Sequence, residues 1–521
     1  MNSPSRAAPA PLAPRPWRWL AGAILLGVAL RAWLHFRSPL VPGINGAYYL
    51  IQARALIEKG TLGIPDLPLT FYLHATVARV FAWISTAPIE SAIVISVKVL
   101  DSVLPPLAAV PVFFLVRKWS AACARGTLAA GAAALAVGAG APALFMVGDF
   151  QKNSLGLVWF AGLLWSLRAW LDDHTPRRAA LVLLLLGLVG LTHVGVFGTA
   201  ALAAGLVVGM HFARRRDGSV LRALPWVLAA ALVIGAVGAL VAWKFDPVRV
   251  QKLVTSFTQP VHYLSGSDPR MPAGGPPGGG PPGAMGALPV VLFSLVVVSG
   301  LVLAWRRRDF LPAADTTLVA GLALTLLLLT GPWVRGDKIM RFYLNAMIPA
   351  VLVGSFVLIQ LPWRRTRVVI GAVAILLLVG SGVPMLSRGG RQIVAAESIP
   401  ELRSLATMIP HPERTLIVAM HGVEWWAAWT LHTRIAHADA LRPEDWQRYD
   451  VLFLDGKMKM PFPMPDRSGP PGGPGHRPGG VPPGPLGRPV IPPDAEILHR
   501  GDHWTLARVT HPVPAPPRPF P

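Results

Sequence analysis

Long apolar runs, separated by short polar segments, dominate the chain up to about residue 386. A run of roughly 20 mostly apolar residues is long enough to cross the hydrocarbon core of a bilayer as a helix. By that rule the sequence predicts eleven spans, near residues 17–36, 90–116, 127–147, 154–171, 178–196, 198–213, 221–243, 286–305, 315–333, 342–361 and 367–386. The sixth run is short, and one half of a re-entrant pair is the alternative for it. The pattern therefore predicts a polytopic α-helical membrane protein.

Composition and charge agree with this class. Hydrophobic residues make up 53% of the chain and charged residues 14%, whereas a soluble protein carries about a quarter charged residues. The net charge of +22 would suggest a nucleic-acid partner in a soluble protein. In a membrane protein, Arg and Lys instead collect in cytoplasmic loops, so we expect no nucleic-acid partner.

The cationic clusters fall at alternate ends of the predicted helices, and this sets the orientation. They are Arg15/Arg18, Arg117/Lys118/Arg125, Arg168/Arg177/Arg178, Arg214–Arg216, Arg306–Arg308 and Arg364/Arg365/Arg367. With eleven helices, all of them lie on one side if the N-terminal tail, residues 1–16, is cytoplasmic. We expect a multi-pass protein of a bacterial or archaeal cell (inner) membrane. Its first apolar run is a retained helix, because no small-residue cleavage site follows it.

The first outward segment, residues 37–89, is predicted to hold two amphipathic helices. Ala47–Lys59 has apolar residues at helical spacing and is followed by Gly60, a typical helix stop. A turn around Asp66 precedes a second helix, Leu69–Ile84. Such helices lie in the membrane interface, where they form either a surface anchor or the rim of a substrate site.

Residues 387–521 are predicted to form a small α/β domain outside the membrane. The runs RTLIVAM, RIAHA and DVLFLD read as strands, HGVEWWAAWTLHT as a helix and AEILHRGDHWTLARV as a terminal hairpin. His421–Glu424 follow a strand and open a helix, which is the favoured ligand edge of an open α/β sheet. Candidate contacts to a sugar or acceptor are His421, Glu424, Trp425 and Trp426. For the tryptophans, packing or membrane contact is the favoured interpretation.

Two Pro/Gly-rich runs interrupt the outward part of the chain. One lies within the loop 244–285 and the other spans 466–489. Such runs form no core and stay flexible. We interpret both as inserts, with a lid over a site as the alternative for the first.

The segment GDFQKN, residues 148–153, places a polar cluster between two apolar helices on the outward face. One hypothesis makes Asp149 a metal ligand or general base and Lys152 a ligand for a lipid phosphate. The alternative is a capping loop, in which Asp149 or Asn153 accepts from free amides at the start of the next helix. Gln151 and Lys152 exceed what a cap requires, which favours the functional hypothesis.

Further cations lie on the same predicted face. Arg335, Lys338 and Arg341 break the positive-inside trend and suit a clamp for a phosphate or diphosphate; pairing with anionic headgroups is the alternative. Arg54 and His193 join these candidates for substrate or phosphate binding, although a structural role for His193 is equally well supported.

Ionisable residues inside apolar runs are costly and are functional candidates by default. Arg31, His35, Lys98 and Asp101 fall in or near such runs. Lys98 and Asp101 are one helical turn apart, so we expect them to neutralise each other.

Together these motifs resemble the GT-C class of membrane glycosyltransferases, and distantly the catalytic subunits of oligosaccharyltransferases. The resemblance covers roughly residues 17–386. The phrases that carry it are GAYYLIQARALIEKGTLGIPDLPL after the first helix, GDFQKN, KIMRFYLNAMIPA and, in the C-terminal domain, EWWAAW.

The resemblance implies transfer of a sugar from a polyprenyl-phosphate or -diphosphate donor to a glycan, lipid or protein acceptor at the outer membrane face. It also implies catalytic carboxylates and a divalent metal, Mg²⁺ or Mn²⁺. Where the family commonly has an acid, this chain has Asn45, so Asp66 and Asp149 are the catalytic candidates and Asp149 the metal ligand.

Two other classes of function stay open. Loss of the acid at position 45 is consistent with a catalytically inactive GT-C-like scaffold. A lipid or solute transporter would also use many helices with buried charges, but it would show an internal repeat with broken helices; the sequence reveals none.

Overall fold

The computed structural model describes residues 17–121, 126–214, 284–331, 339–361, 392–436, 443–456 and 491–510, with shorter stretches within 240–244, 369–388 and at 441. The predicted span near 221–243 falls almost entirely outside the described residues, and more than half of the span near 367–386 does so as well. So do the N-terminal tail, both Pro/Gly-rich runs, Arg335 and Lys338.

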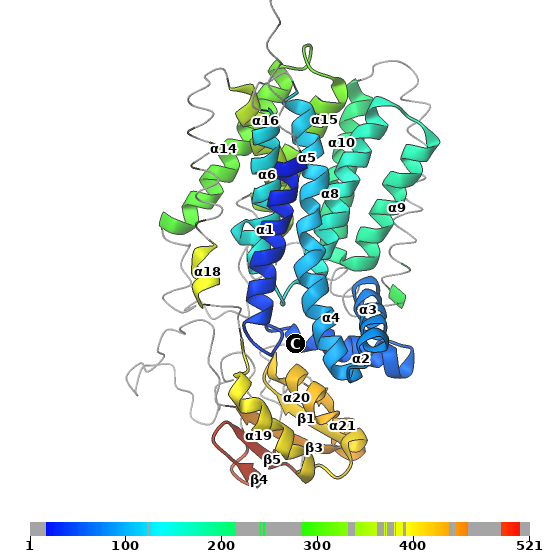
Figure 1. Ribbon diagram of the computed structural model, residues 1–521, viewed down its shortest axis with the longest axis vertical. Helices are drawn as coiled ribbons and strands as arrows, with labels where there is room; N and C mark the ends of the chain where they lie inside the picture. Colours follow the sequence, from blue (N-terminus) through cyan, green and yellow to red (C-terminus); the bar gives the residue numbers. More distant parts are fainter. Residues whose placement is uncertain are drawn as a thin grey trace, which may run out of the picture.

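Seven helices in the described part of the chain are long and apolar enough to cross a membrane. They are Trp17–Phe36 (α1), Ile89–Trp119 (α4, Ile89–Val103; η1, Pro105–Ala108; α5, Ala109–Trp119), Gly126–Phe145 (α6, Gly126–Ala139; α7, Ala141–Phe145), Gln151–Asp172 (α8), Val194–Arg214 (α10), Ala313–Thr330 (α15) and Met340–Gln360 within α16 (Ile339–Gln360). Two more helices, α9 (Pro176–Thr192) and α14 (Ala284–Arg306), pack beside them (Figure 1). The prediction of a polytopic helical membrane protein is confirmed, whereas the count of eleven spans and the orientation stay predictions.

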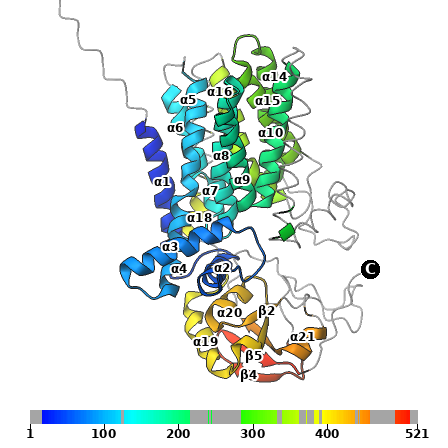
Figure 2. The ribbon, with the colours of Figure 1, turned by 90° about the vertical axis from the view of Figure 1, so that its right-hand side faces the viewer.

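Helices α2 (Gly46–Lys59) and α3 (Leu69–Ser85) cross one end of this bundle, as predicted for the segment 37–89 (Figure 2). We name this the domain-side end. Gly60 ends α2 in the left-handed conformation, with φ of 71°. The surface-anchor interpretation is wrong for α2, because 10 of its 14 residues are buried between the bundle and the C-terminal domain. Only α3 keeps an exposed apolar face, which includes Trp83 and Ile84.

The C-terminal domain contains a five-stranded mixed sheet of order β2-β1-β3-β5-β4. Its strands are β1 (Thr415–Ala419), β2 (Arg434–Ala436), β3 (Asp450–Gly456), β4 (Glu496–Arg500) and β5 (Trp504–Arg508). β1 runs parallel to β2 and β3, while β5 pairs antiparallel with β3 and β4. Each strand falls in a run predicted from the sequence, so the mixed α/β character is confirmed; the domain boundaries stay predictions.

One apolar core joins this domain to the domain-side end. Helices α19 (Ile399–Ser404) and α20 (Val423–Leu431) cover the sheet face that points toward α2. Leu50 of α2, Val423 of α20 and Ile417 of β1 are fully buried in the same cluster. On the other face, β1 and β3 pack with residues near α21 (Pro443–Arg448), a helix that the sequence did not predict. Shared burial of this kind fixes the domain against the bundle.

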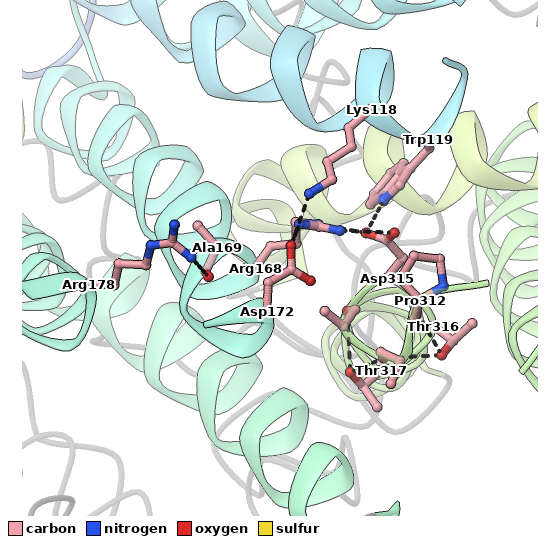
Figure 3. Close-up of polar contacts among 12 residues, drawn as sticks. Lys118, Trp119, Arg168, Ala169, Asp172, Arg178, Pro312, Asp315, Thr316 and Thr317 are labelled. Carbon is pink, nitrogen blue, oxygen red and sulfur yellow. Dashed lines mark hydrogen bonds and ion pairs between the residues drawn. The ribbon is translucent and has the colours of Figure 1, made fainter. Parts of the chain in front are cut away.

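The opposite end of the bundle is fastened by a cluster of charges, of which Arg168 and Asp315 are buried (Figure 3). Arg168 on α8 pairs with Asp172 and, at 2.7 Å, with Asp315 on α15. Trp119 Nε1 on α5 donates to Asp315 at 2.8 Å, and Lys118 Nζ lies 3.0 Å from Asp172. Buried charges persist when they are paired and hydrogen-bonded in this way. The cluster therefore ties three membrane helices together far from the C-terminal domain.

Candidate active site

Two glycines let the loop before α2 touch the loop before α8. Gly43 has φ of 97°, and a Cβ there would lie 2.7 Å from the backbone nitrogen of Asp149. Gly148 has φ of 75°, and a Cβ there would overlap the carbonyl oxygen of Pro42. Glycine suits both positions because it adopts positive φ freely and permits close backbone approach. The contact brings GDFQKN against the segment that contains Asn45.

Asn45 orients the carboxylate of Asp149. Oδ1 of Asp149 accepts from the backbone N–H of Asn45 at 3.1 Å and from its side-chain Nδ2 at 2.7 Å. The hydroxyl of Tyr49 donates to the carbonyl of Asp149 at 3.3 Å. Phe150, which has no polar side chain, occupies the N-cap position of α8. Oδ1 of Asp149 is therefore directed toward the loop before α2, and the choice between a functional and a capping role for Asp149 stays a prediction.

Asp66 and Lys152 form a buried ion pair. Asp66 is fully buried, and its Oδ2 also accepts from the hydroxyl of Tyr48 at 2.5 Å while Oδ1 accepts from the N–H of Leu67 at 2.7 Å. The ammonium of Lys152 lies 5.4 Å from the ring centroid of Phe71, a cation–π distance. Two residues that were predicted separately, as base and as phosphate ligand, thus meet in one pair.

His421 and Glu424 form the side of the site that the C-terminal domain supplies. His421 Nδ1 lies 2.9 Å from Oε1 of Glu424, which is buried, whereas the imidazole is half exposed. The hydrogen bond to Glu424 raises the pKa of His421; the negative charge of Asp149 acts in the same direction and the positive charge of Arg341 opposes it. His421, Asp149 and Arg341 therefore lie within electrostatic range of one another.

The three tryptophans of α20 differ in what they touch. The ring of Trp425 packs on Tyr48 with centroids 5.0 Å apart, and the hydroxyl of Tyr48 donates to Asp66. Trp426 is buried in the core shared with α2. Trp429 lies under the guanidinium of Arg54, 4.8 Å from its ring centroid. Packing thus accounts for Trp426 and Trp429, and Trp425 is the one of the three that borders the site.

Arg54 serves the docking of the C-terminal domain. Its guanidinium donates to the carbonyls of Ala428 and Trp429 at the end of α20, each at 2.8 Å. Cations at a helix C-terminus are favourable because they meet the negative end of the helix dipole. Burial lowers the pKa of Arg54. Its predicted role in phosphate binding is untested.

The other two predicted cationic ligands lie at helix starts. His193 is buried at the junction of α9 and α10, where its Nδ1 accepts from the N–H of Val196 at 3.2 Å. This contact gives the residue a structural role at the start of α10. Arg341 is exposed in the first turn of α16. Phosphate binding by either residue stays a prediction.

A buried charge network behind GDFQKN was missed from the sequence. Asp101 accepts from Arg31 at 2.6 Å, from His35 at 2.7 Å and from the N–H of Gly148 at 2.8 Å. The predicted Lys98–Asp101 pairing is wrong, since Lys98 Nζ donates to the carbonyls of Ser38 and Pro39. The charged residues in apolar helices were the signal for such a network. The groups that Asp101 binds, however, lie 47 to 70 residues away from it in the sequence.

Within the described part of the chain, the side chains of the site do not form the divalent-metal site that the sequence resemblance implies. Among the described residues, no group of three or more His, Cys, Asp or Glu side chains converges as a metal site. Oδ1 of Asp149 already accepts two hydrogen bonds from Asn45, and Asp66 is committed to Lys152. A hard cation such as Mg²⁺ requires several oxygen ligands that are not already engaged.

No protein-family model matches the chain, and no curated protein matches it in sequence. Solved structures do match its fold. The oligosaccharyltransferase of Archaeoglobus fulgidus, determined in complex with Zn and sulfate, has a TM-score of 0.52 at 13% identity, over 84% of this chain and 67% of that one. ArnT from Cupriavidus metallidurans, bound to undecaprenyl phosphate, has a TM-score of 0.47 at 14% identity, over 95% of this chain and 98% of that one. The arabinofuranosyltransferase AftD from Mycobacteria has a TM-score of 0.44 at 13% identity, over 85% of this chain and 36% of that one. The fold is therefore similar to that of GT-C membrane glycosyltransferases.

Proposed function

We propose that this protein is a membrane glycosyltransferase that moves a sugar from a polyprenyl-phosphate or -diphosphate donor to an acceptor at the domain-side face, outside the cytoplasm. The observation that carries the proposal is the convergence of Asp149, Lys152 and His421 where the helix bundle, α2 and the C-terminal domain meet. The fold similarity to the archaeal oligosaccharyltransferase supports the class of reaction.

In the proposed reaction, the bond between the sugar's anomeric carbon and the donor phosphate breaks, and a bond to the acceptor oxygen or nitrogen forms. Asp149 takes the acceptor proton, with its carboxylate oriented by Asn45. Positive charge stabilises the departing phosphate, and Lys152, Arg341 and protonated His421 are its candidate sources.

We assign Asp66 to the positioning of Lys152. It is fully buried and accepts from Tyr48 and Leu67 as well as from Lys152. A carboxylate engaged in this way is a weak base. The half-exposed His421 and Trp425 border the same space, and we propose them as contacts to the sugar or the acceptor. No step of the proposal uses a metal.

One observation favours an inactive GT-C-like scaffold as the second candidate. Position 45 holds an amide that donates to Asp149, where the sequence resemblance implies a second acid. The site then holds one carboxylate where the resemblance implies two. The scaffold would retain binding of the lipid phosphate through the cations and lack turnover.

The test uses full-length protein in nanodiscs and a panel of radiolabelled polyprenyl-phosphate and -diphosphate sugars, with and without Mg²⁺, Mn²⁺ or EDTA. The proposal expects sugar release or transfer that falls by about 100-fold or more in Asp149→Asn. Asp309→Asn, a change at an exposed side chain, is the matched control and should keep full turnover. Tight donor binding without turnover would establish the scaffold. Absence of donor binding would contradict both candidates and favour a transporter.

A further inference from the structure

Three consecutive arginines lie at the end of helix α14, and the proposed reaction uses none of them. Arg306 is the last residue of α14, and Arg307 and Arg308 begin the connection to α15. All three are exposed. We name them the arginine patch. Because α15 starts beside Asp315, in the charge cluster of Figure 3, the patch lies at the opposite end of the bundle from the candidate active site.

The connection that carries the patch is fixed by hydrogen bonds to three helices. The backbone N–H of Arg307 donates to the carbonyl of Leu303 in α14 at 2.9 Å. The guanidinium of Arg214, the last residue of α10, donates to the carbonyl of Arg308 and to the hydroxyl of Thr316 in the first turn of α15. These bonds hold the arginines at the junction of α10, α14 and α15.

The charge of the patch suits an anionic ligand. The segment 305–311, WRRRDFL, has three arginines and one acid, so its formal charge is 3 − 1 = +2. The acid, Asp309, lies 3.6 Å from Nε of Arg308, and both side chains are exposed. An exposed pair of this kind is weak, so it competes poorly with a bound anion. A guanidinium can bind two phosphate oxygens at once, which favours a phosphate group as the ligand.

Two exposed aromatic side chains flank the patch. Trp305 is 69% exposed and Phe310 is 79% exposed. The guanidinium of Arg308 lies over the ring of Trp305, 4.2 Å from its centroid, which is a cation–π distance. Tryptophan is enriched where a membrane protein meets the headgroup region of the bilayer. The patch therefore lies at the level of the lipid phosphates.

One face of α14 leads from the patch into the apolar part of the bilayer. Its exposed residues recur at the helical spacing i, i+3, i+7 and i+10; they are Leu295, Val298, Val302 and Trp305. We name this face the apolar stripe. Val297, on another side of the helix, is buried in the core of the bundle. Exposed apolar side chains on a helix of such a bundle face lipid, so an acyl chain along the stripe places its headgroup at the arginines.

We propose that the end of α14 binds an anionic glycerophospholipid. The phosphate of the lipid accepts hydrogen bonds from the arginine patch, and an acyl chain packs along the apolar stripe. Clusters of cations directly beyond the end of a membrane helix favour anionic headgroups. A zwitterionic phospholipid binds less well, because its own cation offsets the charge of its phosphate. Because Arg214 joins α10 to the same connection, the bound lipid stabilises the junction of the three helices. The inference does not depend on the proposed transferase activity.

The test uses delipidated full-length protein in detergent, with thermal unfolding as the readout. The ligands are dioleoylphosphatidylglycerol, dioleoylphosphatidylcholine and glycerophosphoglycerol, which is the anionic headgroup without acyl chains. The anionic lipid should raise the Tm of the wild-type protein by about 2 °C or more beyond the effect of the zwitterionic lipid. The free headgroup should have no such effect. The difference between the two lipids should shrink in about 1 M NaCl, because salt screens exposed charges.

Two double variants show whether the patch is responsible. Arg307→Gln/Arg308→Gln should raise the concentration of anionic lipid that gives the half-maximal shift by about 10-fold or more. Arg117→Gln/Arg177→Gln is the matched control, because it removes the same charge from exposed residues in the last turn of α5 and the first turn of α9. The control should keep the response of the wild-type protein.

Four outcomes would overturn the proposal. Equal shifts with the two phospholipids would show that the headgroup charge is not recognised. A full shift with the free headgroup would replace the lipid by a soluble phosphate. An unchanged response in Arg307→Gln/Arg308→Gln would exclude the patch as the site. Equal losses in the two double variants would attribute the response to the overall surface charge.

Discussion

Asn45 and Asp149 lie 104 residues apart in the sequence, yet the amide of Asn45 donates to Oδ1 of Asp149 at 2.7 Å. The backbone N–H of Asn45 donates to the same oxygen. This arrangement holds one carboxylate at the domain-side end with a neutral partner. A second acid at position 45 would instead bring two negative charges together, and like charges at this distance favour either a shared proton or a bound cation.

Asn45→Asp should therefore make stability dependent on metal. In EDTA the variant should lose about 1–3 kcal/mol of unfolding free energy, because a donor is replaced by a like charge. Mn²⁺ should restore much of this loss. Thermal unfolding in EDTA and in Mn²⁺ measures both effects, with the wild-type protein as control. Equal Tm values for the variant under the two conditions would contradict the prediction.

Lys152→Met should destabilise the protein by about 3–5 kcal/mol, because it leaves the buried carboxylate of Asp66 without its cation. The double variant Asp66→Asn/Lys152→Met should cost less than the sum of the single changes. Lys118→Met is the control, since its ion pair with Asp172 is half exposed and should contribute about 1 kcal/mol or less. Additive losses in a double-mutant cycle of Tm values would show that the two side chains are not coupled.

The His421–Glu424 pair should make stability depend on pH. The pKa of His421 is raised, chiefly by its hydrogen bond to Glu424. Because the pKa of His421 is higher in the folded state, its protonation stabilises the fold. This stabilisation is complete below the ordinary pKa of about 6.5 and is lost as the pH rises through the folded-state pKa. The Tm of the wild-type protein should therefore fall more between about pH 6 and 9 than the Tm of Glu424→Gln does. This pH range includes the ordinary pKa of histidine. Parallel pH curves for the two proteins would count against the assignment.

Arg54→Lys should loosen the C-terminal domain although it keeps the charge. The guanidinium donates to two carbonyls at the end of α20, and a lysine cannot reproduce this planar fork. We expect a loss of about 1.5–3 kcal/mol and faster proteolytic release of the domain. Arg79→Lys, at an exposed residue that donates to Ile57, is the control. Equal cleavage rates for Arg54→Lys and the wild-type protein would exclude this role for Arg54.

The sequence by itself determined the local elements, because each depends on a short-range pattern. Apolar runs long enough to cross a bilayer gave the membrane helices. Gly60 marked the end of α2, and alternation of strand-like and helical runs gave the mixed sheet. The polarity of GDFQKN was sufficient to select Asp149 and Lys152 as candidates, since polar residues between apolar helices are uncommon without a role.

Only the tertiary structure decided which of these residues meet. Asp66 finds Lys152 86 residues later in the chain, and Arg54 finds the end of α20 more than 370 residues later. Such pairs depend on which segments touch. The contact between the loops before α2 and α8, for example, is permitted by the positive φ of Gly43 and Gly148. No local pattern encodes it, because charge and spacing along one segment do not reveal the partner on another. For that reason the sequence assigned Lys98 to Asp101, whereas the folded chain pairs Asp101 with Arg31.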